Sequence, residues 1–120
     1  MNDLQDVQGT WRFASLEVNG ETIAEQHLEG SRLTVSGDAF TTVSPEAVYR
    51  GKIALDATVL PRRIDLLFEE GPHAGESSLG IYELSGETWR ICLGLAGETR
   101  PQDFRTEPES GHALEMLHRL

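Results

Sequence analysis

The spacing of glycines and prolines limits how this chain can fold more than any other feature. Twelve glycines and five prolines occur in 120 residues, and they divide the chain into apolar stretches of strand length. Several of these stretches alternate between two faces, as Ala47 to Leu55 does, with Tyr49 and Ile53 on one face and Arg50 and Lys52 on the other. A period of two residues is typical of half-buried β-strands. The sequence therefore predicts an all-β protein.

The turns and apolar stretches together predict about eight or nine strands and one short helix. Asn19-Gly20 is a strong turn signal that ends the first strand, and Ser85-Gly86-Glu87 is the clearest hairpin turn. The helix is expected after the first strand, over residues 21–29, where Gly30 would end it. The expected strands are Thr10–Val18, Ser31–Val35, Ala39–Val43, Ala47–Leu55, Arg63–Glu69, Ser77–Leu84, Thr88–Leu93, a short extended piece at Gln102–Arg105, and Ala113–Leu120.

These elements favour an antiparallel arrangement in one domain. Parallel strands need crossover connections of about a dozen residues or more, and only residues 21–29 could supply a helical one. An antiparallel meander of this many strands commonly closes into an up-and-down β-barrel, which removes its edges. A barrel of about eight strands can hold side chains or one small ligand inside. A β-sandwich of the same strands is the structural alternative. Residues 1–120 are expected to form a single domain.

Charge and hydropathy exclude several classes of partner. Twenty acidic and ten basic residues give a formal net charge of −10, and Arg62-Arg63 is the only adjacent basic pair. A nucleic-acid-binding protein needs a basic stripe to neutralise phosphates, so we expect no nucleic-acid partner. No apolar run approaches the roughly 20 residues that span a bilayer, and the first six residues do not resemble a signal peptide. We therefore expect a soluble, cytoplasmic protein that does not bind membranes.

The reactive side chains form no recognisable catalytic or metal-binding motif. His27, His73, His112 and His118 lie far apart in the sequence, and none forms a helical His-x-x-x-His pair. A single cysteine, Cys92, excludes an intramolecular disulfide, and its apolar neighbours favour a packed side chain over a nucleophile. No nucleophile elbow or phosphate-binding loop occurs. We expect no metal, no cofactor and no catalytic residue.

Gly9-Thr10-Trp11, at the start of the first strand, resembles the Gly-x-Trp motif of the lipocalins and their relatives. In that family the Trp closes the floor of the barrel and packs against a basic residue of the last strand. The resemblance implies structural roles for Gly9 and Trp11, with Arg119 as the basic partner. A guanidinium lying over an indole ring would form a cation–π contact.

Further segments extend this resemblance over residues 4–120. They are Val7–Arg12, Val18–Gly20, Gly80–Leu93 and Arg100-Pro101-x-x-Phe104. The pattern is similar to a family of small lipocalin-like domains of unknown function that is frequent in Planctomycetes and other soil bacteria. The resemblance implies a lipocalin-like barrel, but it supplies neither a substrate nor a catalytic residue.

The barrel pattern makes a small apolar or amphipathic molecule the preferred ligand, bound by Tyr49, Phe68, Tyr82 and Arg90. A buried arginine needs a carboxylate or an anionic ligand, because an unpaired buried charge is costly. A structural ion pair of Arg90 with Glu17, Asp65 or Glu83, or plain exposure of its side chain, is the alternative to a ligand-orienting role. Arg100 is expected to anchor a loop. A ligand-free barrel acting as a protein-interaction module is the alternative, and an enzyme that uses the cavity is a third hypothesis. Either a monomer or a homodimer fits the sequence.

Overall fold

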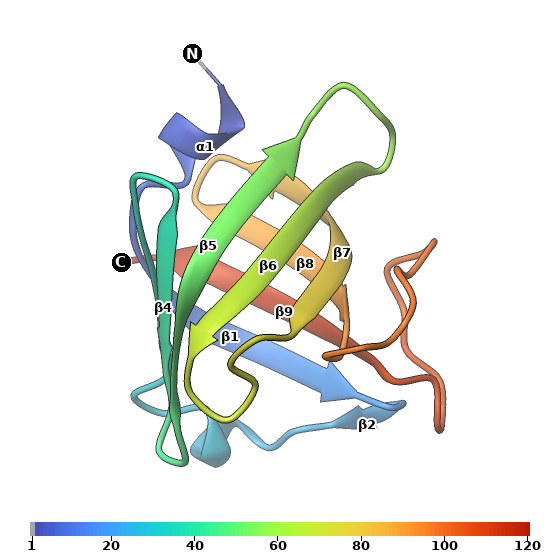
Figure 1. Ribbon diagram of the computed structural model, residues 1–120. Helices are drawn as coiled ribbons and strands as arrows, with labels where there is room; N and C mark the ends of the chain where they lie inside the picture. Colours follow the sequence, from blue (N-terminus) through green and yellow to red (C-terminus); the bar gives the residue numbers. More distant parts are fainter. Residues whose placement is uncertain (1) are drawn as a thin grey trace.

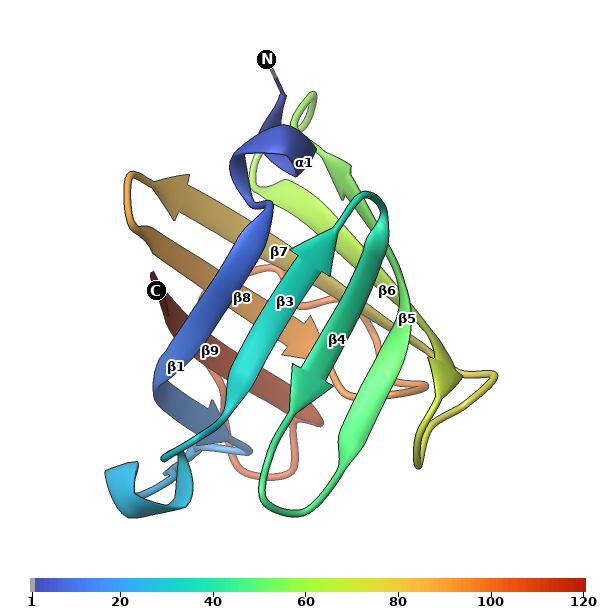
Figure 2. The same ribbon diagram turned by 90° about the vertical axis from the view of Figure 1, so that its left-hand side faces the viewer.

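The computed structural model describes residues 2–120, which form a closed antiparallel β-barrel (Figure 1). Its strands are β1 (Gly9–Val18), β2 (Glu21–Thr22), β3 (Arg32–Ser36), β4 (Ala39–Val43), β5 (Val48–Asp56), β6 (Arg62–Glu70), β7 (Ser77–Ser85), β8 (Thr88–Gly94) and β9 (His112–Arg119). From β3 to β9 each strand pairs with the next, and β1 pairs with both β3 and β9 (Figure 2). This closure confirms the predicted barrel and excludes the sandwich.

The helical elements differ in place from the sequence prediction. A short helix, α1 (Asp3–Asp6), precedes β1, and the side chain of Asn2 caps it by accepting the backbone N–H of Gln5 at 2.9 Å. Residues 21–29, predicted to be helical, instead form β2 and a single 3-10 turn, η1 (Glu25–His27). The Asn19-Gly20 turn is the physical reason. Both residues adopt positive φ values, 51° and 81°, so the chain reverses and pairs with the end of β1.

Residues 95–111 cross the outer surface of the barrel without pairing as a strand. The extended piece predicted at Gln102–Arg105 is therefore a loop, and β2 is the ninth strand. Arg100 anchors this segment as predicted: its guanidinium donates to the carbonyl of Gly80 and to the Asp65 carboxylate, each at 2.7 Å. Underneath, the thiol of Cys92 is fully buried and donates to the carbonyl of Arg105 at 3.6 Å. Burial raises the pKa of Cys92 to about 11, which keeps the thiol protonated.

One end of the barrel, which we call the floor, is filled by large side chains. The rings of Trp11 and Trp89 meet edge-to-face at 5.3 Å, and the indole N–H of Trp11 donates to the carbonyl of Val7 at 2.9 Å. The guanidinium of Arg119 lies 4.3 Å from the centre of the Trp11 ring, so the predicted contact is present. Gly9 has a φ of 110°, which favours glycine and lets the chain turn directly beside Arg119.

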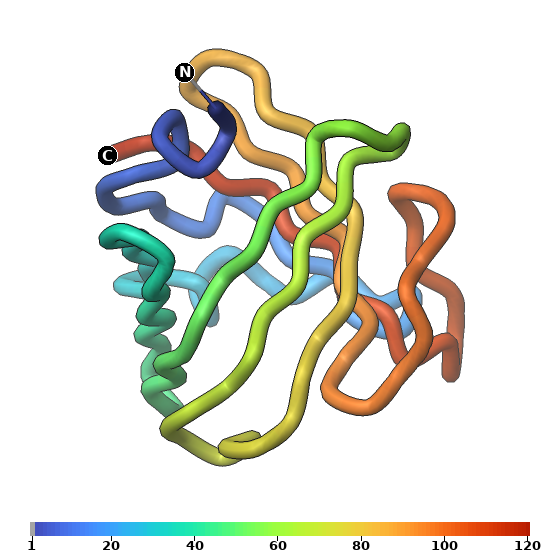
Figure 3. The backbone as a smooth tube through the Cα atoms, turned by 45° about the horizontal axis from the view of Figure 1, so that its top comes forward, coloured from blue at the N-terminus to red at the C-terminus, as the bar shows by residue number. Residues whose placement is uncertain are grey.

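Helix α1 covers the floor from outside. Figure 3 shows this coil beside the C-terminal end of the chain. The Asp3 carboxylate accepts a hydrogen bond from the Tyr82 hydroxyl at 2.6 Å and lies 3.3 Å from the guanidinium of Arg62. Tyr82 is fully buried and packs edge-to-face against Trp89. The floor is therefore closed by packed aromatic rings and tied to α1 by polar contacts.

Candidate functional site

The opposite end of the barrel contains a cavity of about 290 Å³, bordered by η1, the β4–β5 turn and the β6–β7 loop. Its lining is mostly apolar and comes from strands all around the barrel. The apolar members are Phe13, Leu16, Val18, Leu28, Leu33, Ile64, Leu66, Phe68, Ile91, Leu93, Leu95, Ala96 and Ala113. The remaining members are four hydroxyl residues, Ser31, Thr42, Ser44 and Ser78, and three ionisable ones, Tyr49, His73 and Glu115. Such a lining suits an apolar body with a few polar contacts.

Three rings form an aromatic group within this lining: Tyr49, Phe68 and His73. The imidazole of His73 stacks on Tyr49 at 5.9 Å with an interplanar angle of 9°, and Tyr49 meets Phe68 edge-to-face at the same distance. His73 lies on the β6–β7 loop, where its Nδ1 is 3.5 Å from a carboxylate oxygen of Glu76. The aromatic group therefore offers flat π surfaces to a ligand.

Glu115 is the one acidic side chain in the cavity lining. It lies in the middle of β9, opposite Leu16 of β1 and Ile91 of β8. Burial raises the pKa of the Glu115 carboxyl from 4.5 to about 7. Within residues 2–120, no group hydrogen-bonds this carboxyl. It is therefore an isolated acid in an apolar cavity, near the midpoint of its titration at neutral pH.

The strand register explains why Glu115 faces inward. Trp11 is paired with Arg119, so Arg119 and every second residue before it, including Leu117 and Glu115, share a face with Trp11. A β-bulge between Phe13 and Ser15 shifts the alternation of β1 by one residue. Leu16 consequently joins the cavity lining opposite Glu115.

The predicted ligand residues divide between three places. Tyr49 and Phe68 lie together in the cavity, as predicted. Tyr82 belongs to the packed floor instead, where burial and its bond to Asp3 raise the pKa of its hydroxyl. Arg90 lies outside the barrel, because Trp89 and Ile91 on either side of it face inward.

Arg90 has protein partners of its own on that outer surface. Its guanidinium pairs with the Glu83 carboxylate and lies 4.1 Å from the centre of the Phe104 ring. Of the other two internal partners considered, Asp65 pairs with Arg100, and Glu17 accepts a hydrogen bond from the Thr106 hydroxyl. None of these charged residues lines the cavity.

Sequence reasoning missed Glu115 and His73 as cavity residues. A signal for Glu115 was present, because the expected contact between Arg119 and Trp11 fixes which face of the last strand points inward. Counting back by twos from Arg119 then reaches Glu115. No comparable signal existed for His73, because its position depends on the path of the β6–β7 loop.

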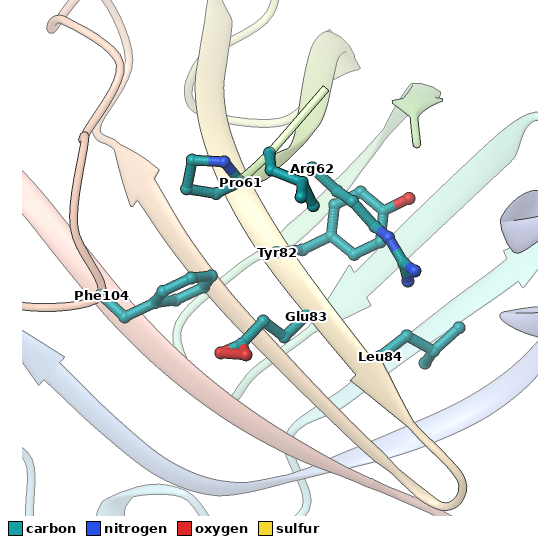
Figure 4. A pocket seen from close by; sticks show the side chains of 7 residues that line it. Pro61, Arg62, Tyr82, Glu83, Leu84 and Phe104 are labelled. Carbon is teal, nitrogen blue, oxygen red and sulfur yellow. The ribbon is translucent and has the colours of Figure 1, made fainter. Parts of the chain in front are cut away.

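A second hollow, of about 520 Å³, lies beside β7 (Figure 4). Its lining comes from Leu60, Pro61, Arg62, Tyr82, Glu83, Leu84 and Phe104. Leu60 is 89% exposed, which shows that this surface groove has an open side. Two of its lining residues are charged and already paired, Arg62 with Asp3 and Glu83 with Arg90. The barrel cavity offers a ligand a larger apolar lining. The barrel cavity is therefore the stronger candidate site.

No protein-family model, no curated protein and no solved structure matches this chain significantly. Within residues 2–120, no group of three or more His, Cys, Asp or Glu side chains is placed to hold a metal ion. In the same part of the chain, no helix has the length and apolar character needed to cross a membrane.

Proposed function

We propose that this barrel binds a small apolar or amphipathic molecule in the cavity that Tyr49, Phe68 and Glu115 help to line. The observation that supports it is an apolar cavity of about 290 Å³ above a floor packed with large side chains. A cavity of that volume corresponds to roughly ten water molecules. Burying a ligand there would release water from apolar walls, which is the usual driving force for such binding.

The experiment compares two leucine substitutions by titration with the fluorescent dye 1-aminoanthracene. Ala113 is 3% exposed and lines the cavity, so Ala113→Leu adds bulk where the ligand would lie. Ala54 lies on the exposed face of β5, so Ala54→Leu adds the same atoms outside the barrel. We expect enhanced dye fluorescence with the wild type and with Ala54→Leu, and affinity about ten-fold weaker with Ala113→Leu.

Two results would count against the proposal. The first is an unchanged fluorescence when folded wild-type protein is added to the dye. The second is equal affinity for the two variants, which would place the dye elsewhere. Circular dichroism of each variant shows whether the barrel remains folded, so that loss of binding is not mistaken for loss of structure.

A ligand-free barrel that acts through its outer surface is the second candidate. The observation in its favour is the groove beside β7, where Leu60 is exposed next to Pro61 and Phe104. Catalysis in the cavity has less support. Within residues 2–120, Glu115 has no hydrogen-bonded partner of the kind that nucleophiles and proton relays use.

Other features of the proposal come from the sequence. The protein would be lipocalin-like in family as well as in shape, and it would act in the cytoplasm as a monomer or homodimer. Neither nucleic acid nor a membrane would be its partner, in keeping with a net charge of −10.

A further inference from the structure

We infer that the cavity selects small apolar molecules that carry a basic nitrogen, and that Glu115 binds this nitrogen as an ammonium–carboxylate pair. The inference rests on the proposed ligand-binding function and adds the chemical class of the ligand. It begins from the isolation of one carboxyl group among apolar side chains.

Among the described residues that line the cavity around Glu115, none is a Lys or Arg. The other ionisable members of this lining are Tyr49 and His73. The residues paired with Glu115 are apolar, Leu16 on β1 and Ile91 on β8. An unpaired carboxylate in such surroundings is costly. A ligand that brings a positive charge to Glu115 would remove this cost.

The charged groups nearest to Glu115 along the neighbouring strands point away from the cavity. On β8, Arg90 pairs with Glu83 on the outer surface, and Cys92 is buried beneath residues 95–111. On β1, Glu17 accepts a hydrogen bond from Thr106. None of these side chains lines the cavity. The ligand's own charge is consequently the available counter-charge for Glu115.

The same arrangement disfavours an anionic ligand. A ligand carboxylate in the cavity would approach Glu115 with no lining Lys or Arg to receive it. His73 is the single lining side chain that could become cationic, and it already lies 3.5 Å from the Glu76 carboxylate. Fatty acids and similar carboxylates should therefore bind more weakly than neutral molecules of the same shape.

The volume and the aromatic group narrow the class further. About 290 Å³ suits a ligand of roughly ten to fifteen non-hydrogen atoms. The rings of Tyr49, Phe68 and His73 can stack against a flat apolar body and can also contact a cation through their π faces. Small arylalkyl amines combine these properties.

The raised pKa of Glu115 determines how ligand affinity should change with pH. Burial raises the pKa of the Glu115 carboxyl to about 7, so an ammonium ligand must bind the ionised fraction of the protein. Amine affinity should therefore rise as pH increases from 6 to 8, whereas a carboxylate ligand should show the opposite slope. His73 also lines the cavity and histidines can change charge in this range. The change of amine affinity with pH is therefore measured in His73→Gln as well.

The experiment uses three ligands with one apolar body: 2-phenylethylamine, 2-phenylethanol and phenylacetate. Calorimetric titrations compare wild type, Glu115→Gln and Glu69→Gln, where Glu69 is an exposed residue of β6. For wild type and Glu69→Gln, we expect the amine to bind about ten-fold more tightly than the alcohol, and phenylacetate more weakly than the alcohol. Glu115→Gln should lose that ten-fold advantage, so that the amine binds this variant no more tightly than the alcohol does.

The outcomes separate this inference from the proposed function. If the alcohol binds but the amine gains nothing, or if Glu115→Gln leaves amine affinity unchanged, the role of Glu115 is wrong and the binding cavity stands. A fall in amine affinity as pH rises from 6 to 8 would also contradict the proposed role of Glu115. If none of the three ligands binds folded wild-type protein at millimolar concentration, both the cavity function and the ligand class fail.

Discussion

At the residue scale, Glu115 links the stability of the barrel to pH. Burial raises its pKa from 4.5 to about 7, so the folded state holds this proton more tightly than the unfolded state does. The resulting stabilisation is fully present below about pH 4.5, and it is lost as pH rises through 7. We expect the free energy of unfolding to fall by about 2 kcal/mol between pH 5 and pH 8 on this account.

Urea denaturation across this pH range at constant salt measures the effect. Glu115→Gln should flatten the pH dependence, because a glutamine does not titrate. Glu69→Gln is the matched control, since it removes one negative charge from the exposed outer surface and should retain the slope. Identical slopes in the two variants would show that Glu115 is not the group responsible.

Two residues show where sequence reasoning about the site succeeded and where it did not. Tyr49 was placed correctly, because clean alternation in its strand indicates which residues face inward. The placement of Arg90 in the cavity was wrong. The sequence of its strand does not show whether Arg90 or its neighbours Trp89 and Ile91 face the interior. Shifting the assignment of a strand by one residue moves all of its side chains to the opposite face of the sheet. Glu83 was among the predicted partners of Arg90, and the two residues pair across the hairpin at Ser85-Gly86-Glu87. The contact of Arg90 with Phe104 was not predicted, because it depends on the path of residues 95–111.

At the element scale, Gly51 lies where β5 and β6 leave no room for a side chain. A Cβ atom at this position of β5 would lie 1.8 Å from the carbonyl oxygen of Leu67 on β6 and 3.0 Å from the ring of Phe40. Backbone atoms of a paired strand cannot move aside without breaking the hydrogen bonds between the two strands. We expect Gly51→Ala to destabilise the barrel by about 3 kcal/mol or more.

Thermal unfolding of Gly51→Ala beside two other variants checks this prediction. Gly80→Ala should be less harmful, because its nearest contact, with the carbonyl oxygen of Cys92, is 2.5 Å. Lys52→Ala, at an exposed position next to Gly51, should have little effect. A Gly51→Ala protein as stable as Lys52→Ala would mean that β5 and β6 are not so closely apposed.

The strands were predictable from sequence because each has its own turn signals and alternation. Ala39–Val43 was predicted with its observed bounds, and the other long strands within about two residues of them. Helix α1 was not predictable, because four residues with no apolar periodicity carry little local signal. The contacts of its Asp3 with Tyr82 and Arg62 tie it to the floor. Gln102–Arg105 has an extended composition, but no neighbouring strand has an edge left to pair with it.

At the scale of the whole molecule, the excess of acidic residues opposes the compact state. A net charge of −10 is confined to a barrel with a radius of gyration of 13.1 Å. Exposed ion pairs such as Lys52 with Asp38 contribute little to stability. Repulsion between the remaining carboxylates is therefore the main long-range electrostatic effect on folding.

Salt should consequently stabilise this protein at neutral pH. The screening length is about 10 Å at 0.1 M ionic strength, which is shorter than the barrel, so added NaCl weakens the repulsion more than it weakens close ion pairs. We expect the free energy of unfolding at pH 7.5 to rise by about 1 kcal/mol between roughly 0.02 and 0.3 M NaCl. Near the isoelectric point of about 4.7 the same increase should vanish, because the net charge is then close to zero. Urea denaturation at both pH values measures this difference. Stability that fell with salt at pH 7.5 would mean that attractive ion pairs outweigh the repulsion between acids.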